Sequence, residues 1–352
     1  MKFVEYRSLH YEYFKTIILQ MGLFCPLQCK HCSVFAGPRR PEKMAPDLAR
    51  TIIADFALSP EASVVVLTGG EPFAMMDCLD QSLAEINKHP RLHSYVITSG
   101  HWARSMEDAV SILRSLPHIS LMMVSADIYH EQFVPLEYVR NALHAGHSLG
   151  RDLVVSITDS PDSSNYVDRV RKLIGPRVWK AIEHDIVQIQ PTGRAKVYGI
   201  GSFPTTPMAL PDGACELLGT PVYVANGNAV VCCQIDVTNE APRKTDSPYH
   251  IGNAYRDGFR MIKERVEGDA VMQALRVWGP RELVRILTEH GYRPRLKQHY
   301  DGVCFLCRDL LCDPDAVKLL REKLNEPVIQ NQIRLSRMLQ YGELRPCPDG
   351  IA

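Results

Sequence analysis

The sequence predicts an α/β fold: a partial (β/α)6 barrel of the TIM type, followed by a small α+β domain. Over the first two hundred residues, short apolar runs rich in Val, Ile and Leu alternate with helical patterns, as is typical of parallel strands buried on both faces. A proline-bearing joint at residues 201–213 then marks a change of pattern. An open doubly wound sheet is the competing architecture, because it shows the same alternation.

Six apolar runs are the expected strands, and they cover residues 16–23, 63–67, 93–97, 120–124, 153–157 and 186–189. Helical patterns lie between them. Residues 46–58 begin with a proline at the first helical position. Ser105 can cap the next helix, and residues 135–149 begin with a proline and stop before Gly150.

Polar and glycine-rich motifs follow the expected strands at their carboxyl ends, where ligands bind in parallel α/β folds. They read FCPLQCKHC at 24–32, TGGEP at 68–72, TSGH at 98–101, SAD at 125–127, TD at 158–159 and PTGRA at 191–195. Paired glycines allow close backbone approach, and a carboxylate beside them can accept a hydrogen bond from an ammonium or a hydroxyl group.

The first motif places Cys25, Cys29 and Cys32 on one short loop. Thiolates are the usual ligands of iron–sulfur clusters, and three of them would leave one iron of a cubane open. A zinc site that lacks a ligand and buried cysteines that act as small hydrophobes are the alternatives for this loop taken alone.

The composition excludes several classes of partner. Forty basic and forty acidic residues cancel, so the sequence shows neither the charge of a nucleic-acid binder nor a polybasic membrane anchor. The N-terminus lacks the apolar stretch of a signal peptide, and no apolar run is long enough to span a membrane. We therefore expect a cytoplasmic protein, in which eleven cysteines indicate metal binding or catalysis rather than disulfides.

The cysteine loop and TGGEP together resemble the radical S-adenosylmethionine (SAM) superfamily, whose signature is CxxxCxxC after the first strand and GGEP after the second. The resemblance covers residues 16–195. It implies that Cys25, Cys29 and Cys32 bind a 4Fe–4S cluster and that SAM chelates the open iron. With a flavodoxin- or ferredoxin-type reductant, such enzymes cleave SAM to a 5′-deoxyadenosyl radical, which removes hydrogen from the substrate.

The same resemblance implies which residues contact SAM. These residues are His31, Gly69, Gly70, Glu71, Ser99, Ser125 and Asp127. The glycines and the glutamate would hold the methionine amino group, and the histidine would lie against the adenine. The remaining three occupy strand ends from which the family contacts the ribose and the carboxylate.

A second cysteine region follows the joint. Asn226-Gly227 between two apolar runs predicts a β-hairpin. Cys215, this hairpin, an Ile-Gly-Asn sequence at 251–253 and a later CxxC resemble the auxiliary-cluster extensions called SPASM and Twitch. The resemblance to Twitch implies one auxiliary 4Fe–4S cluster, with the ligands Cys215, Cys232, Cys304 and Cys307.

Several points about this region stay open. The spacing of Cys312 departs from the full SPASM pattern, so whether Cys233, Cys312 or Cys347 binds a cluster is undecided. A zinc ribbon is the alternative for the CxxC pair. The expected domains are residues 1–205 for the barrel, 206–313 for the auxiliary-cluster domain and 314–352 for a helical tail.

An auxiliary cluster with four protein ligands can accept an electron but has no open iron for substrate. The Twitch resemblance therefore favours an oxidoreductase that dehydrogenates a small molecule, such as a sugar or an aminocyclitol, rather than a peptide. Arg194 is expected to orient the substrate oxygen, and Tyr129, His130 and Glu131 come next as proton-handling candidates.

Three other functions remain as alternatives. The first is a peptide-modifying maturase, against which the sequence has only twenty-four residues before Cys25, too few for a peptide-recognition domain. The second is a radical epimerase with a cysteine hydrogen donor. The third is a non-catalytic scaffold stabilised by zinc.

Overall fold

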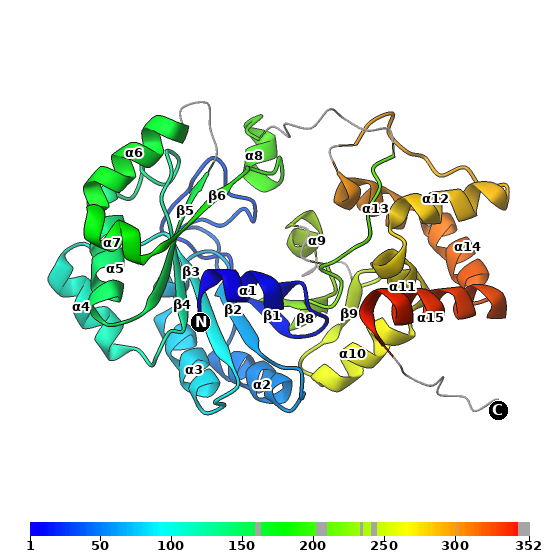
Figure 1. The fold of residues 1–352 in the computed structure, drawn as a ribbon, viewed down its shortest axis with the longest axis horizontal. Helices are drawn as coiled ribbons and strands as arrows, with labels where there is room; N and C mark the ends of the chain where they lie inside the picture. The colour runs from blue at the N-terminus through cyan, green and yellow to red at the C-terminus, as the bar shows by residue number, and fades with distance from the viewer. Residues whose placement is uncertain (159–162, 202–209, 233–234, 241–244, 301, 344–352) are drawn as a thin grey trace. The chain divides into compact units, whose positions relative to one another are not determined.

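The computed structural model describes residues 1–158, 163–201, 210–232, 235–240, 245–300 and 302–343. The chain forms two compact units (Figure 1). The first comprises residues 1–204 and 219–263, and the second comprises 205–218 and 264–352. Among the described residues, every helix is too short or too polar to cross a bilayer.

One sheet of nine strands organises the first unit, in the order β6-β5-β4-β3-β2-β1-β7-β8-β9. The strands are β1 (Thr16–Gln20), β2 (Val64–Thr68), β3 (His93–Thr98), β4 (Leu121–Ser125), β5 (Asp152–Thr158), β6 (Glu183–Val187), β7 (Val222–Tyr223), β8 (Asn228–Val230) and β9 (His250–Asn253). Strands β1–β6 are parallel and adjacent in sequence order, so all their carboxyl ends lie at one edge. This arrangement confirms the α/β fold class.

The sixth strand begins three residues before its predicted apolar run. Strand β6 lies at the edge of the sheet, where its residues alternate between half-buried and exposed, and Ile186 is 58% exposed. An edge strand needs no continuous apolar run. The run at 186–189 therefore misplaces the element.

The hairpin lies in the first unit, whereas the sequence placed it in the second domain. Strand β7 pairs in parallel with β1, and β8 and β9 continue the sheet in antiparallel fashion. Gly227 has a positive φ of 83° in the predicted turn, as that turn requires. The strands expected in the small domain therefore extend the main sheet instead.

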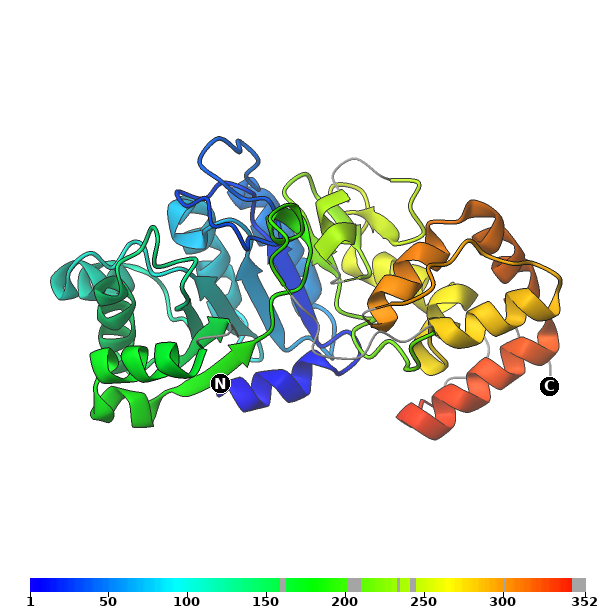
Figure 2. The same cartoon turned by 90° about the horizontal axis from the view of Figure 1, so that it is seen from above.

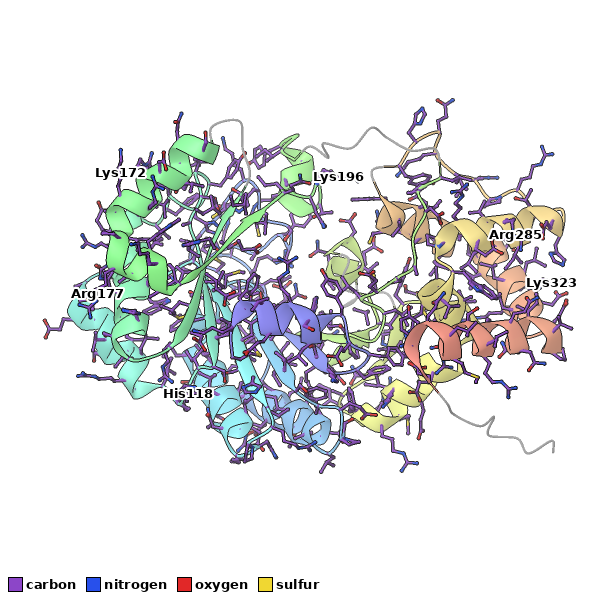
Figure 3. The ribbon with its side chains drawn as sticks, viewed as in Figure 1. His118, Lys172, Arg177, Lys196, Arg285 and Lys323 are labelled. Atoms are coloured by element: carbon purple, nitrogen blue, oxygen red, sulfur yellow. The ribbon has the colours of Figure 1, made fainter. Side chains whose placement is uncertain are left out.

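Helices follow the strands of the first unit and pack against one another. They are α2 (Pro46–Ala57), α3 (Met76–Asn87), α4 (Met106–Ser115), α5 (Leu136–Ser148), α6 (Ser163–Ile174), α7 (Pro176–Ala181), α8 (Gly193–Val197), α9 (Ile235–Glu240) and α10 (Phe259–Gly268), with a 3₁₀ turn η1 at Pro72–Ala74. Ser105 caps α4 as predicted, since its hydroxyl accepts a hydrogen bond from the Asp108 N–H at 3.0 Å. Charged side chains such as Lys172 and Arg177 cover α6 and α7 on the solvent side (Figure 3).

An N-terminal helix that the sequence analysis missed, α1 (Phe3–His10), closes the interior at the amino ends of the strands (Figure 2). Phe3 and Tyr6 pack against buried residues of β2, β3, β4 and β5. Glu183, the first residue of β6, accepts hydrogen bonds from the backbone N–H groups of Phe3 at 2.6 Å and Val4 at 3.1 Å. These bonds satisfy two of the free donors at the start of the helix.

The second unit is helical over its described residues. Its helices are α11 (Ala270–Val277), α12 (Pro280–Glu289), α13 (Val303–Leu311), α14 (Pro314–Leu324) and α15 (Pro327–Tyr341). Helix α11 packs against α14 and α15, and α12 packs against α13 and α14. The expected tail is thus part of this unit's core.

Candidate functional site

A cavity of about 400 Å³ opens at the carboxyl ends of the parallel strands. The cysteine loop, the TGGE turn and the ends of β1–β4 line it, with the apolar side chains of Ile18, Val66 and Ile97 deeper inside. Tyr6 and His10 of α1 also contribute to the lining. We call this space the site cavity.

The three cysteines of the loop converge on the site cavity. Cys25 and Cys29 are buried, and Cys32 is partly exposed. Burial raises the pKa of the Cys25 thiol to about 12 and also raises the pKa of Cys29, and neighbouring thiols of the loop add to both shifts. Three soft donors close enough to influence one another suit an iron–sulfur cluster, and metal binding would release their protons.

The paired glycines of the TGGEP turn lie directly against the backbone of the cysteine loop. The Gly70 N–H donates to the Gly22 carbonyl at 2.8 Å, and the Glu71 N–H donates to the Phe24 carbonyl at 3.0 Å. A Cβ on Gly70 would lie 2.0 Å from the Phe24 oxygen, and Gly69 has a φ of 137°. Only glycine fits such an approach, so this turn positions the loop.

The Glu71 carboxylate is buried and accepts four hydrogen bonds from the protein. Oε1 accepts from the Thr98 hydroxyl at 2.7 Å and from the Phe73 N–H at 3.1 Å. Oε2 accepts from the Ser99 N–H at 2.8 Å and from its hydroxyl at 2.5 Å. These bonds hold the ends of β2 and β3 together. The expected contact of Glu71 with the methionine amino group of SAM stays a prediction.

Electrostatics keep this carboxylate charged. Burial alone would raise the pKa of Glu71, but the His101 imidazole, whose Nδ1 lies 3.7 Å from Oε2, and the donors of Ser99 outweigh it and lower the pKa. A buried carboxylate with four donors is stabilised in its ionised form. The end of the sheet is therefore fixed by a charged group.

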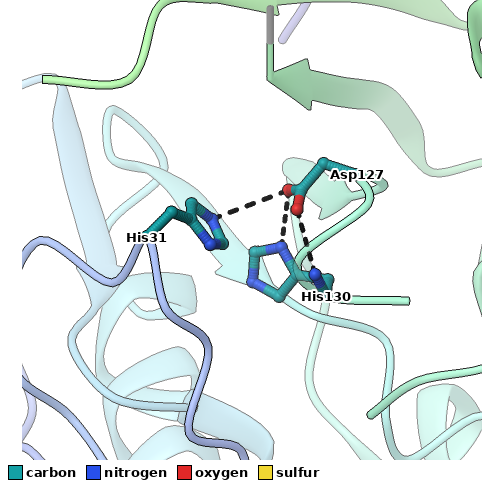
Figure 4. A group of neighbouring side chains, drawn as sticks. All are labelled: His31, Asp127 and His130. Atoms are coloured by element: carbon teal, nitrogen blue, oxygen red, sulfur yellow. Dashed lines mark hydrogen bonds and ion pairs between the residues drawn. The ribbon is translucent and has the colours of Figure 1, made fainter. Parts of the chain in front are cut away.

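The Asp127 carboxylate, just beyond β4, is likewise occupied by the protein (Figure 4). Oδ1 accepts from the N–H groups of Tyr129 at 2.9 Å and His130 at 3.0 Å, and Oδ2 lies 2.6 Å from the His130 Nδ1. Burial opposes ionisation, yet His130 lowers the pKa of Asp127 to about 2. The same carboxylate, against the effect of burial, raises the pKa of His130, and this histidine lines the site cavity.

His31 lies between the cysteine loop and this pair. Its ring stacks on Tyr129 with centroids 4.8 Å apart, and its Nε2 lies 3.7 Å from the Asp127 Oδ2. Burial lowers the pKa of His31 to about 4, so the ring is neutral at physiological pH. A neutral, stacked imidazole at the cavity wall is compatible with the predicted contact to adenine, which stays a prediction.

The other residues predicted to contact SAM differ in whether they line the site cavity. Ser99 and Ser125 line the site cavity together with Gly69, Gly70 and Glu71. Asp127 does not itself line the site cavity, but it contacts His130, which does. The structure thus gathers the predicted residues at one place, but it gives both carboxylates protein partners.

Arg194, which is distant from the cysteine loop in the sequence, hydrogen-bonds to the backbone of that loop. Its Nε donates to the Cys29 carbonyl at 2.9 Å, its Nη1 donates to the Ala36 carbonyl at 2.5 Å, and its backbone N–H donates to the Cys32 carbonyl at 2.9 Å. A Cβ on the preceding Gly193 would lie 2.1 Å from the Ser33 oxygen. In the structure, Arg194 therefore positions the cysteine loop. Its expected contact with a substrate oxygen stays a prediction.

The cysteines of the second region belong to both units. Cys215, Cys304 and Cys307 lie in the second unit, the latter two on α13, and Cys232 lies in the first. Burial raises the pKa of Cys215 to about 11, and the nearby Cys304 adds to the shift. The roles of Cys232 and Cys312 stay predictions.

Three positions named from the sequence lie outside the described residues. They are Asp159, Cys233 and Cys347.

Sequence reasoning missed three polar residues near the loop. Gln20, Thr238 and Asn239 line cavities of the first unit, and Asn239 donates to the Ser33 carbonyl at 2.9 Å. A glutamine that ends the apolar run Thr16–Gln20 was the available signal for the first of them.

Known proteins resemble this chain in sequence and fold. The model of the Radical SAM superfamily matches residues 19–180. The putative peptide biosynthesis protein YydG of Bacillus subtilis (strain 168) is 21% identical over 309 residues, which cover 85% of this chain and 92% of that protein.

Solved structures extend the comparison of the fold. Native anSMEcpe with bound AdoMet has a TM-score of 0.50 at 10% identity, and the match covers 91% of this chain and 99% of that one. BtrN in complex with AdoMet and 2-DOIA has a TM-score of 0.47 at 14% identity, with 75% and 88% covered.

The expectation that a small molecule is favoured over a peptide as substrate was wrong. The relative that covers 85% of the chain is a putative peptide biosynthesis protein. The expectation rested on the electron that an auxiliary cluster could accept. Electron transfer does not distinguish the two classes, because hydrogen and an electron can be removed from a peptide as well as from a sugar.

Replacement of Arg194 by leucine should loosen the cysteine loop. The change removes two hydrogen bonds from a charged donor, each worth about 1.5–3 kcal/mol. We expect the reconstituted Arg194→Leu protein to lose cluster iron to a chelator at least about tenfold faster than wild type, a change that corresponds to about 1.4 kcal/mol.

The matched control is Arg39→Leu, in the same loop. Arg39 is exposed and makes no side-chain hydrogen bond to the described residues. Equal rates of iron loss in the two variants would contradict the positioning role of Arg194.

Proposed function

We propose that this chain, whose residues 19–180 match the Radical SAM superfamily as its cysteine loop and TGGEP turn predicted, modifies peptides. One observation carries the proposal. The relationship to the putative peptide biosynthesis protein YydG extends over 85% of this chain, well beyond the residues that the family model matches. A shared sequence over both units supports a shared class of substrate.

The residues around the site cavity fit the cofactors of the family. Cys25, Cys29 and Cys32 would hold the 4Fe–4S cluster, with SAM at the iron that they leave open. When bound, the reduced cluster and SAM supply a carbon-centred radical that removes a hydrogen atom from an unactivated C–H bond.

The chain's own groups would confine that reaction. Ile18, Val66 and Ile97 make the inner wall of the site cavity apolar, and an apolar wall keeps water from reactive species. Glu71 and Arg194 hold the two loops that form the entrance in fixed positions. Catalytic geometry must be held to a fraction of an ångström, and these buried contacts supply that precision.

We also propose that the second unit binds an auxiliary cluster through Cys215, Cys304 and Cys307. The observation that supports it is electrostatic: burial raises the pKa of Cys215, and Cys304, which is near enough to act on it, adds to the shift. Cys304 and Cys307 are three residues apart on α13, so they lie on one face of that helix. The cluster would accept or deliver electrons.

Iron content tests the auxiliary cluster. We expect about eight irons in the anaerobically reconstituted wild type and about four in the Cys215→Ala/Cys304→Ala variant, since each cubane holds four. Cys78→Ala is the matched control, because this buried cysteine of α3 lies outside both regions, and it should keep all the iron. Zinc in place of the second set of irons would contradict the proposal.

Transfer of deuterium tests the substrate class. The reduced holoprotein is incubated with SAM and a peptide digest of perdeuterated protein, and 5′-deoxyadenosine is analysed by mass spectrometry. If the protein acts on peptides, 5′-deoxyadenosine gains one deuterium from the digest and none from an unlabelled digest. Deuterium from perdeuterated sugars but none from the digest would contradict the proposal.

A further inference from the structure

The site cavity extends from the carboxyl ends of the strands through the interior of the first unit to α1, the helix at their amino ends (Figure 2). We call its inner part the inner pocket, and the residues that line it are Tyr6, His10, Ile18, Val66, Ile97 and Val222. None of these residues is a predicted ligand of the cluster or of SAM. The inner pocket is therefore space that the predicted cofactors leave for another ligand.

His10 is the last residue of α1, and one of its ring nitrogens lacks a partner. The Nδ1 atom is buried and makes no hydrogen bond to the described residues. The residue itself is held in place, because its ring stacks on Tyr6 with centroids 5.2 Å apart and its carbonyl accepts a hydrogen bond from the Thr220 hydroxyl at 3.3 Å. Buried polar groups are rarely left unsatisfied, so a bound molecule is the expected partner of Nδ1.

The surroundings of His10 favour an uncharged partner. Aliphatic side chains form most of the lining of the inner pocket. Burial alone lowers the pKa of His10, so its imidazole is neutral at physiological pH, with one nitrogen as a donor and the other as an acceptor. An ammonium, guanidinium or carboxylate group would find no opposite charge among these lining residues, and burying an unpaired charge has a large cost. The group that fits is uncharged and forms hydrogen bonds.

His10 lies at the end of β1 that is far from the cysteine loop. Val222 pairs with Ile18 in a parallel register, so Thr220 lies level with the first residue of β1. The Thr220 hydroxyl is the group that bonds the His10 carbonyl. At a rise of about 3.3 Å per residue, the length of β1 is about 13 Å. A peptide that reacts beside the cysteine loop therefore needs a long side chain to reach His10.

We propose that His10 recognises the substrate, through a hydrogen bond from its ring to a long, uncharged side chain of the peptide, such as that of glutamine or tyrosine, in the inner pocket. The inference rests on the proposed function, because it takes the substrate to be a peptide. The aliphatic lining contacts the stem of that side chain, and His10 contacts its polar end. A site built to hydrogen-bond a substrate group rejects analogues that lack the group, since its own polar atom is then left unpaired.

The affinities of synthetic peptides test the inference without turnover. The probes are pentapeptides of alanine whose central residue is glutamine, tyrosine, leucine, lysine or glutamate. Calorimetry measures their binding to the holoprotein with SAM and without reductant. We expect the glutamine or the tyrosine peptide to bind wild type at least about tenfold more tightly than the other three kinds, a difference of about 1.4 kcal/mol.

Variants of His10 show whether the hydrogen bond causes this preference. His10→Leu keeps an apolar side chain but removes both ring nitrogens, and it should bind the peptides with nearly equal affinity. His10→Asn keeps a donor and an acceptor close to the position of Nδ1, and it should restore the preference. The matched control is His147→Leu, at a partly buried histidine of α5 that does not line the site cavity, and it should behave as wild type.

The melting temperature separates recognition from a structural role. A ring needed only for folding would lower the melting temperature in His10→Leu and His10→Asn alike and leave the order of the peptide affinities unchanged, which would overturn the inference.

The outcomes are distinct for the two proposals. Equal affinities of wild type for all the peptides, or no binding, overturns the role of His10, and water then satisfies Nδ1. Tight binding of the lysine or glutamate peptide also overturns it. A preference that depends on His10, without deuterium transfer from the peptide digest to 5′-deoxyadenosine, supports the inner pocket and counts against the proposed reaction. Deuterium transfer without the preference supports the reaction and overturns the inner pocket.

Discussion

The hydrogen bonds that hold the cysteine loop are the constraint on which the rest of the site depends. On one side, the backbone of Gly70 and Glu71 pairs with the start of the loop. On the other, Arg194 binds the carbonyls of Cys29 and Ala36. A loop with three thiols has many conformations in isolation, and ordering it has an entropic cost. Buried contacts from both sides offset that cost.

The two buried carboxylates also hold parts of the protein in place. Glu71 and Asp127 are buried and fully engaged with donors of the protein, so they act on the ends of β2, β3 and β4. Buried charged groups thus fix the frame of a cavity whose inner wall, at Ile18, Val66 and Ile97, is apolar, which favours a dry reaction.

The sequence was sufficient for the elements whose signals are local. Short apolar runs located five of the six parallel strands, and the cysteine spacing with TGGEP indicated the superfamily whose model matches residues 19–180. Arg194 was expected at the end of the sixth strand, but it lies on α8, beyond β6. Its partners are 165 and 158 residues away in the sequence, and no local pattern reveals them. The hairpin was predicted from its turn, but its pairing with β1 joins segments far apart in the sequence, and no local pattern predicts such a pairing. The class of substrate was misjudged, since the sequence of a barrel mouth does not state what enters it.

The most direct test of this account is the electron paramagnetic resonance spectrum of the reduced, reconstituted protein before and after addition of SAM. If Cys25, Cys29 and Cys32 hold a cluster with an open iron, SAM should change the signal of that cluster. The changing signal should be absent from Cys29→Ala, which removes one of the three ligands. A wild-type spectrum that SAM leaves unchanged, or a protein that contains zinc and gives no such signal, would contradict it.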